Sequence, residues 1–191
     1  MNLRDILSVI AGILMVSGFV PYIRTIWTGS TRPAKTSWII WASLDTITIA
    51  GMYVQYALNG QIVGSVVCAW IVVAIALRYG TKGWTWLDKF CLMGAVLGII
   101  LWKAFSSPTL GIITSNSVVF LGSIPTFVSA WKDPTKEDKA GWTMWWISCV
   151  FAVAAIPKLT FDDAVQPLVF FSVETIMMFL LYIKPNITRS L

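Results

Sequence analysis

The chain has 191 residues, of which 57% are hydrophobic and 12% are charged, and its formal net charge at pH 7 is +5. A mean hydropathy of +0.76 and 11 tryptophans exclude an ordinary soluble domain. The composition is that of an integral membrane protein.

Seven apolar stretches follow one another along the chain, and each is close to the roughly 20 residues that cross a hydrocarbon core as a helix. They cover residues 5–26, 37–58, 61–79, 86–105, 109–131, 141–157 and 164–183. These stretches are too long for barrel strands, so we expect seven spanning helices. The first lacks the small-residue cleavage site of a signal peptide, and we expect it to remain as the first helix.

The first and fifth stretches carry related sequences around a proline, GFVPYIRTIW at 18–27 and GSIPTFVSAW at 122–131. A gap-free shift of 104 residues aligns Gly18 with Gly122, Pro21 with Pro125, Trp27 with Trp131, Thr31 with Thr135, Lys35 with Lys139, Trp38 with Trp142, Trp41 with Trp145 and Ala50 with Ala154. Three tryptophan pairs in register are hard to obtain by chance. Helices 1–3 and 5–7 are therefore predicted to be two copies of one unit.

The fourth stretch has no counterpart in either copy. A three-helix unit ends on the opposite side of the membrane from its start, so one extra crossing gives both copies the same orientation. The predicted fold is an all-α membrane protein with seven transmembrane helices, arranged as two parallel three-helix bundles joined by a linker helix (3+1+3). The first repeat covers residues 1–80, the linker helix 81–107 and the second repeat 108–191.

Lysine and arginine predict the orientation. Seven spans place three of these residues on one side, Arg4, Lys103 and Lys158, and eleven on the other, Arg24, Arg32, Lys35, Arg78, Lys82, Lys89, Lys132, Lys136, Lys139, Lys184 and Arg189. The positive-inside rule puts the N-terminus outside and the C-terminus in the cytoplasm. We expect the membrane to be the plasma (inner) membrane. The positive charge then faces anionic lipid, and nothing else in the chain supports nucleic-acid binding.

The residue inventory argues against an enzyme. The chain has no histidine, and no Ser/His/Asp set, metal-ligand cluster or phosphate-binding glycine motif. Its three cysteines lie inside apolar stretches without metal-ligand spacing, as small hydrophobic residues do. We expect no catalytic residues, no metal and no cofactor.

Two acids lie deep inside predicted spans, Asp45 in the second and Glu174 in the seventh. An ionised carboxylate in a membrane costs several kcal/mol, so such groups usually face a watery cavity or stay protonated. Both lie about 12–13 Å from the cytoplasmic helix ends at 1.5 Å per residue, near the midplane. They are candidates for substrate binding and for proton coupling, with a protonated acid between packed helices as the structural alternative.

The other candidate substrate-binding residues are Trp70 and Asn116. The 104-residue shift places Glu174 on Trp70, which lies midway along the third stretch, and Asn116 is an amide inside the fifth that needs partners. Pro21 and Pro125 lie at matching depths, where a proline weakens the helix and concentrates bending. Paired hinges on one side would suit an inner gate, although static kinks are the alternative.

A three-helix unit with a proline in its first helix, a basic loop and an aromatic-rich second helix, duplicated around one linker helix, resembles the SWEET and PQ-loop transporter superfamily. The Pro-Gln pair of the PQ-loop group is here Pro21-Tyr22 and Pro125-Thr126. The resemblance implies that residues of the third helix of each unit hold the substrate, which corresponds to Trp70 and Glu174. It implies alternating-access transport of a small polar solute, either a sugar or an amino acid-like or cationic metabolite, with or without proton coupling.

Two alternatives share this architecture. Receptors of the KDEL type bind a peptide tail and do not move a solute, and vitamin transporters of the PnuC type move a ring-bearing cation. The expected partners are a small-molecule substrate and the lipid bilayer, and the sequence leaves open whether the protein is a monomer or a homo-oligomer.

Overall fold

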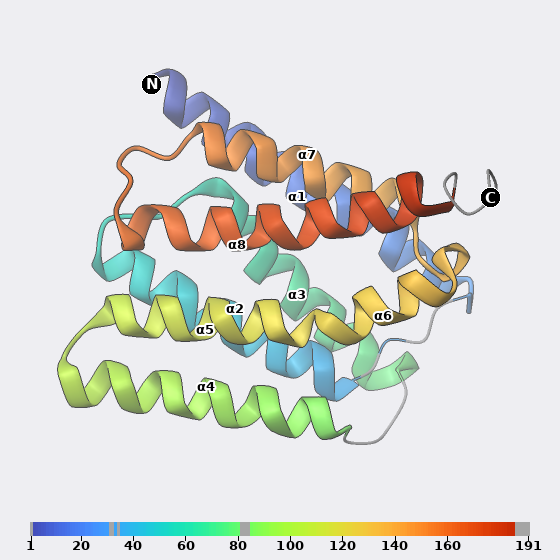
Figure 1. Cartoon of the computed structure of the whole chain (residues 1–191), viewed down its shortest axis with the longest axis horizontal. Helices are drawn as coiled ribbons and strands as arrows, with labels where there is room; N and C mark the ends of the chain where they lie inside the picture. Colours follow the sequence, from blue (N-terminus) through green and yellow to red (C-terminus); the bar gives the residue numbers. More distant parts are fainter. Residues whose placement is uncertain (1, 31–32, 34, 81–84, 186–191) are drawn as a thin grey trace.

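The computed structural model describes residues 2–30, 33, 35–80 and 85–185, apart from the side chains of residues 87, 125, 129 and 136. These described residues form helices and turns without a β-strand (Figure 1). The α-helices are α1 (Leu3–Trp27), α2 (Lys35–Val54), α3 (Gly60–Tyr79), α4 (Trp86–Phe105), α5 (Pro108–Gly122), α6 (Ile124–Lys132), α7 (Lys139–Ala154) and α8 (Phe161–Met178). A 3-10 turn, η1 (Pro134–Lys136), precedes α7, and a π-helical turn, η2 (Phe179–Ile183), continues α8.

The prediction of an all-helical chain is confirmed. Four segments in the described part of the chain are long and apolar enough to cross a membrane: Leu3–Trp27, Gly60–Tyr79, Pro108–Lys132 and Phe161–Ile183. The first of them exposes an apolar outer face, which includes Val9, Ile13, Val16 and Val20. Such a face suits lipid better than water.

The fifth predicted helix differs from the prediction because it is broken at Ser123. The N–H of Ser123 bonds to the carbonyls of Val119 and Phe120, and its hydroxyl donates to Val119 at 2.9 Å. Pro125 follows in the first turn of α6, and its side chain lies outside the described residues. Since proline has no N–H to donate to the preceding turn, a break beside it is expected. Pro21, in contrast, lies inside the uninterrupted α1.

The helices run in alternating directions along the chain, except that α6 continues in the direction of α5, so the bundle has two ends (Figure 1). The N-terminus and the turns after α2, α4 and α7 lie at the first end. At the second end α1, α3, α6 and η2 finish, and α2, α4 and α7 begin. The described cations here are Arg24, Lys35, Arg78, Lys89, Lys132, Lys139 and Lys184. We call this the basic end. Of the other predicted cations, Arg32, Lys82 and Arg189 lie outside the described residues, and so does the side chain of Lys136 in η1.

The helix contacts follow one pattern in both halves of the chain. α3 packs between α1 and α2, and α8 packs between α7 and α5. Across the halves, α1 packs on α7 and α2 packs on α5, while smaller contacts join α2 to α8 and α7 to α3. If α1 is exchanged with α5, α2 with α7 and α3 with α8, this pattern of contacts stays the same. α4 stands apart from it and packs on α5 and α2.

The repeated glycines and tryptophans interlock the halves. Gly18 of α1 faces the indole of Trp145 in α7, so closely that a Cβ at Gly18 would collide with the ring. Gly122 of α5 faces Trp41 in α2, where a Cβ would lie 3.5 Å from Nε1. Gly18 thus lets the backbone of α1 approach a large ring of the other half, whereas a Cβ at Gly122 would only be in ordinary contact with the equivalent ring.

Candidate functional site

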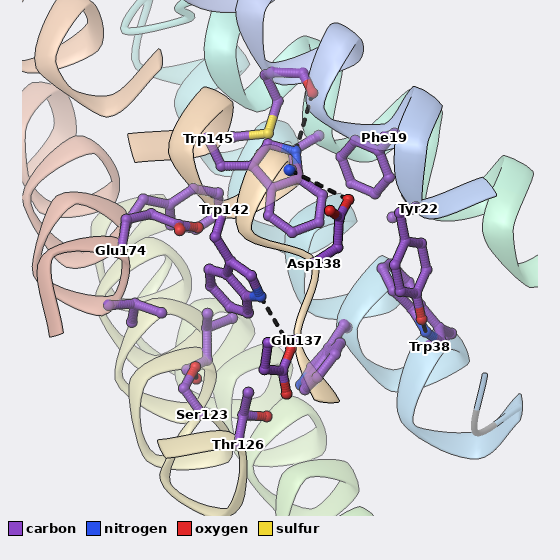
Figure 2. Close-up of a pocket in the computed structure, with 18 of the residues that line it drawn as sticks. Phe19, Tyr22, Trp38, Ser123, Thr126, Glu137, Asp138, Trp142, Trp145 and Glu174 are labelled. Atoms are coloured by element: carbon purple, nitrogen blue, oxygen red, sulfur yellow. Dashed lines mark hydrogen bonds between the residues drawn. The ribbon is translucent and has the colours of Figure 1, made fainter. Parts of the chain in front are cut away.

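A cavity of about 420 Å³ lies between the two halves and reaches the loops before α2 and α7 at the basic end (Figure 2). We call it the central cavity. The 104-residue shift relates eight pairs of residues in its wall: Met15 and Val119, Phe19 and Ser123, Tyr22 and Thr126, Pro33 and Glu137, Ser37 and Gly141, Trp38 and Trp142, Trp41 and Trp145, and Ala69 and Val173. Equivalent positions of the two repeats therefore face one space.

Aromatic rings from three helices form most of the wall near the basic end. Figure 2 shows Phe19, Tyr22 and Trp38 on one side and Trp142 and Trp145 toward the other. The ring centroids of Phe19 and Trp145 are 5.0 Å apart, those of Tyr22 and Trp38 5.4 Å, and those of Trp142 and Trp145 5.4 Å. These are the separations of packed aromatic pairs, so the rings hold one another in place.

Three of these indoles already donate their N–H groups to the protein. Trp145 donates to the Met15 carbonyl at 3.1 Å, Trp38 to the Tyr22 hydroxyl at 3.1 Å, and Trp142 to Glu137 Oε2 at 3.0 Å. Each bond fixes the orientation of a ring. What these rings can offer a ligand is mainly their π faces.

The two deep acids both line the central cavity. Asp45 is 6% exposed and accepts a hydrogen bond from the Ser65 hydroxyl at 2.7 Å. Glu174 is 8% exposed, and its Oε2 is buried without a hydrogen-bond partner. A buried carboxylate oxygen without a donor is unusual in folded proteins, since it forfeits the hydration that it had in water.

The structure does not bring Trp70 to the central cavity. Its ring is 44% exposed on the outside of the bundle, and its indole N–H donates to Thr46 at 3.0 Å. α3 turns Ser65 and Ala69 toward the cavity, four residues apart on one helix face. Trp70 follows Ala69 and is rotated by about 100° around the helix axis, which carries it away from the cavity.

Asn116 also lies away from the cavity wall. It is fully buried where α5 packs on α2, and its Nδ2 donates to the Ile112 carbonyl at 2.9 Å and to the Thr48 hydroxyl at 3.2 Å. Its Oδ1 has no hydrogen-bond partner. The amide therefore joins α5 to α2, across the two halves, but it does not line the central cavity.

Several cavity residues were not among the sequence candidates. They are Tyr22, Trp38, Trp41, Trp142, Trp145 and Glu137. The tryptophans recur in the repeat, and this recurrence was the signal that could have found them, because symmetric halves meet at equivalent positions. Glu137 gave no such signal, since its counterpart is Pro33 and it lies in a mixed-charge connector.

A buried polar network connects the helices between the cavity and the first end of the bundle. Gln166 donates to Gln61 Oε1 at 3.0 Å, Gln61 donates to Ser148 at 3.1 Å, and Ser148 donates to the Ala11 carbonyl at 2.7 Å. Asn59 adds a bond to Gln166 at 2.8 Å. These residues connect α8, α3, α7 and α1, and both glutamines and Ser148 are fully buried. We call this the far-end network.

No family model, no curated protein and no solved structure matches the chain. Its class is therefore defined by its own fold, an all-helical chain with four segments long and apolar enough to cross a membrane. The three cysteines are buried and free, and the described residues contain no cluster of three or more acids or cysteines that could hold a metal ion.

Proposed function

We propose that the protein is a membrane transporter that moves a small polar solute by alternating access through the central cavity. The solute class is a sugar or an amino acid-like or cationic metabolite. The main support is the cavity itself, which is lined by equivalent residues of both halves and contains two buried acids. Its size falls within the roughly 300–1,000 Å³ of small-molecule sites.

The helix contacts support the 3+1+3 arrangement within this proposal. A contact pattern that survives exchange of the halves is what two parallel repeats give, and α4 outside that pattern fits a linker helix. All seven helices then cross the bilayer, α5 and α6 together as one broken helix. The N-terminus is outside, the C-terminus is in the cytoplasm, and the basic end faces the anionic inner leaflet.

In this orientation the structure corresponds to an inward-facing state. The central cavity reaches the loops at the basic end, whereas the far-end network ties both halves together on the other side. Alternating access requires the basic end to close and this network to separate. Pro21, next to the cavity residue Tyr22, and Pro125, beside the break at Ser123, are the proposed hinges of the inner gate.

Asp45 and Glu174 are the proposed proton-coupling groups, because the chain has no histidine and both acids line the cavity. Proton coupling predicts that uptake into vesicles changes with the direction of a pH gradient. If uptake by the original chain and by Glu174→Gln is equally insensitive to the gradient, proton coupling is refuted and uniport remains as the mechanism.

Transport fits the cavity better than capture of a peptide tail. A C-terminal carboxylate is usually bound by cationic side chains or backbone N–H groups, and no lysine or arginine lines the cavity among the described residues. Retention of a soluble peptide on the immobilised protein, without flux into sealed vesicles, would favour a receptor of the KDEL type instead.

A cavity-filling variant tests the transport proposal. Thr126 of α6 lines the cavity, and Thr126→Trp should reduce flux of a transported solute into proteoliposomes to the level of empty vesicles. Val128, two residues further on, is 47% exposed on the outside of the bundle, so Val128→Trp adds the same bulk elsewhere and should retain flux. Equal flux through both variants would contradict a pathway through the central cavity.

A further inference from the structure

We propose that the occupant of the central cavity is an organic ammonium ion, which the aromatic rings and the unpaired carboxylate of Glu174 bind together. This inference deepens the proposed transport function, on which it rests only for the statement that the bound cation crosses the membrane.

The cavity wall carries acidic side chains and, among the described residues, no lysine or arginine. Four carboxyl groups line it, those of Asp45, Glu137, Asp138 and Glu174. Two of these groups have protein donors at the mouth, since Asp138 caps α7 through the N–H groups of residues 140 and 141 and Glu137 accepts from Trp142. Glu174 Oε2 is the one that lies buried without a partner. A cation in the cavity would supply that partner.

The hydroxyl groups of the cavity are largely committed as donors. Ser65 donates to Asp45, Ser37 to Asp88, Ser123 to the Val119 carbonyl and Thr25 to the Tyr22 carbonyl. The indoles of Trp38, Trp142 and Trp145 are committed as well. The Tyr22 hydroxyl, which accepts from Trp38, the Thr126 hydroxyl and the Trp41 N–H stay uncommitted as donors, against four carboxyl groups in the wall. Acceptors therefore outweigh free donors among the described residues of the cavity. The hydroxyl groups of a sugar both donate and accept, so a sugar needs donors from the cavity as well as acceptors. An ammonium group presents only donors or a bare positive charge, and therefore needs acceptors alone.

The aromatic rings of the cavity also attract a cation. Tryptophan is the aromatic side chain that attracts a cation most strongly, and four tryptophans and Tyr22 stand around the part of the cavity nearer the basic end. Rings on more than one side form the kind of cage that recognises alkylated ammonium groups. A bare metal ion fits less well, because the described residues contain no group of three acids that could ligate it.

Binding to the purified full-length protein in detergent tests the inference without any need for transport. The cationic probes are choline, tetramethylammonium and tetraethylammonium, and the neutral controls are 3,3-dimethylbutan-1-ol, which has the shape of choline, and glucose. At least one cation should raise the unfolding midpoint and quench tryptophan fluorescence, with an affinity at least about tenfold above that of both neutral controls. Equal or tighter binding of a neutral control, or no response to any cation at about 10 mM, would overturn the inference.

Variants then locate the bound cation. Glu174→Gln should weaken cation binding at least about tenfold and leave the weak binding of 3,3-dimethylbutan-1-ol unchanged, because only a charged ligand loses the carboxylate. Trp142→Leu should weaken cation binding as well. If Glu174→Gln does not fold, Trp142→Leu serves as the test in its place. Trp70→Phe, outside the cavity, is the matched aromatic control and should bind as the original chain does. Unchanged cation affinity in a folded Glu174→Gln or Trp142→Leu protein would overturn the assignment.

The two proposals fail separately. Cation binding without flux into proteoliposomes would refute transport and leave the cation site intact. Flux of a neutral solute through a protein that binds none of the three cations would leave transport intact and refute the cation site.

Discussion

The substitution Gly18→Ala should destabilise the protein more than the equivalent Gly122→Ala. The added methyl at residue 18 would lie inside the indole of Trp145, whose position is held by its bond to Met15 and by packing on Phe19. Overpacking of this kind costs about 1–3 kcal/mol, and the better helix propensity of alanine returns up to about 1 kcal/mol. We expect a net loss of about 1–2 kcal/mol.

Gly122→Ala is the matched control, because its methyl would meet the sulfur of Cys91 at 3.1 Å and the Trp41 indole at 3.5 Å without entering either. Its loss of stability should be less than about 1 kcal/mol. Thermal unfolding in detergent measures both variants, and each kcal/mol corresponds to about 2–4 °C for a chain of this length. Equal midpoints for the two alanine variants would refute the interlock of α1 with Trp145.

Three further predictions concern residues around the cavity. Asn116→Ala should lower stability by about 1–2 kcal/mol, since it removes a buried donor between α5 and α2, while the solute affinity measured on the folded protein stays unchanged. Gln61→Leu should raise the rate at which an external thiol reagent labels the buried Cys149, in a chain whose other two cysteines are replaced, because it breaks the far-end network. Equal labelling rates of Cys149 with and without Gln61→Leu would contradict the proposal that the far-end network closes this end of the bundle. If Glu174 couples transport to protons, Glu174→Gln should abolish the effect of a pH gradient on vesicle uptake, and a persisting effect would assign coupling elsewhere.

The fold was predictable from the sequence where hydrophobicity and repetition specify it. The fourth apolar stretch, 86–105, coincides with α4, and the 104-residue register recurs as paired residues in the cavity wall. The break at Ser123 was not predicted, because α1 contains its own proline without a break and both segments are long and apolar enough to cross a membrane. Local backbone geometry beside a proline depends on neighbours that apolar periodicity does not report.

The part of the site formed by acids was predictable, because burying a carboxyl group in a membrane costs free energy. Asp45 and Glu174 stand out in any apolar stretch, and both lie in the cavity wall. Trp70 was selected through the repeat register, but a register fixes depth along a helix and leaves open which way the side chain points. Trp38 and Trp142 matched the pattern of interfacial anchors equally well, so only the packing of the halves reveals that they line the cavity.

The most direct test of alternating access measures two distances across the halves by double electron–electron resonance. One spin-label pair joins the exposed Thr28 and Lys132 at the basic end, and the other joins Tyr56 and Leu159, which are 97% and 90% exposed at the first end. Our account predicts that a bound solute shifts the distribution of the first pair to shorter distances and that of the second to longer ones. Distributions that are unchanged by a solute that binds, or that move in the same direction at both ends, would contradict it.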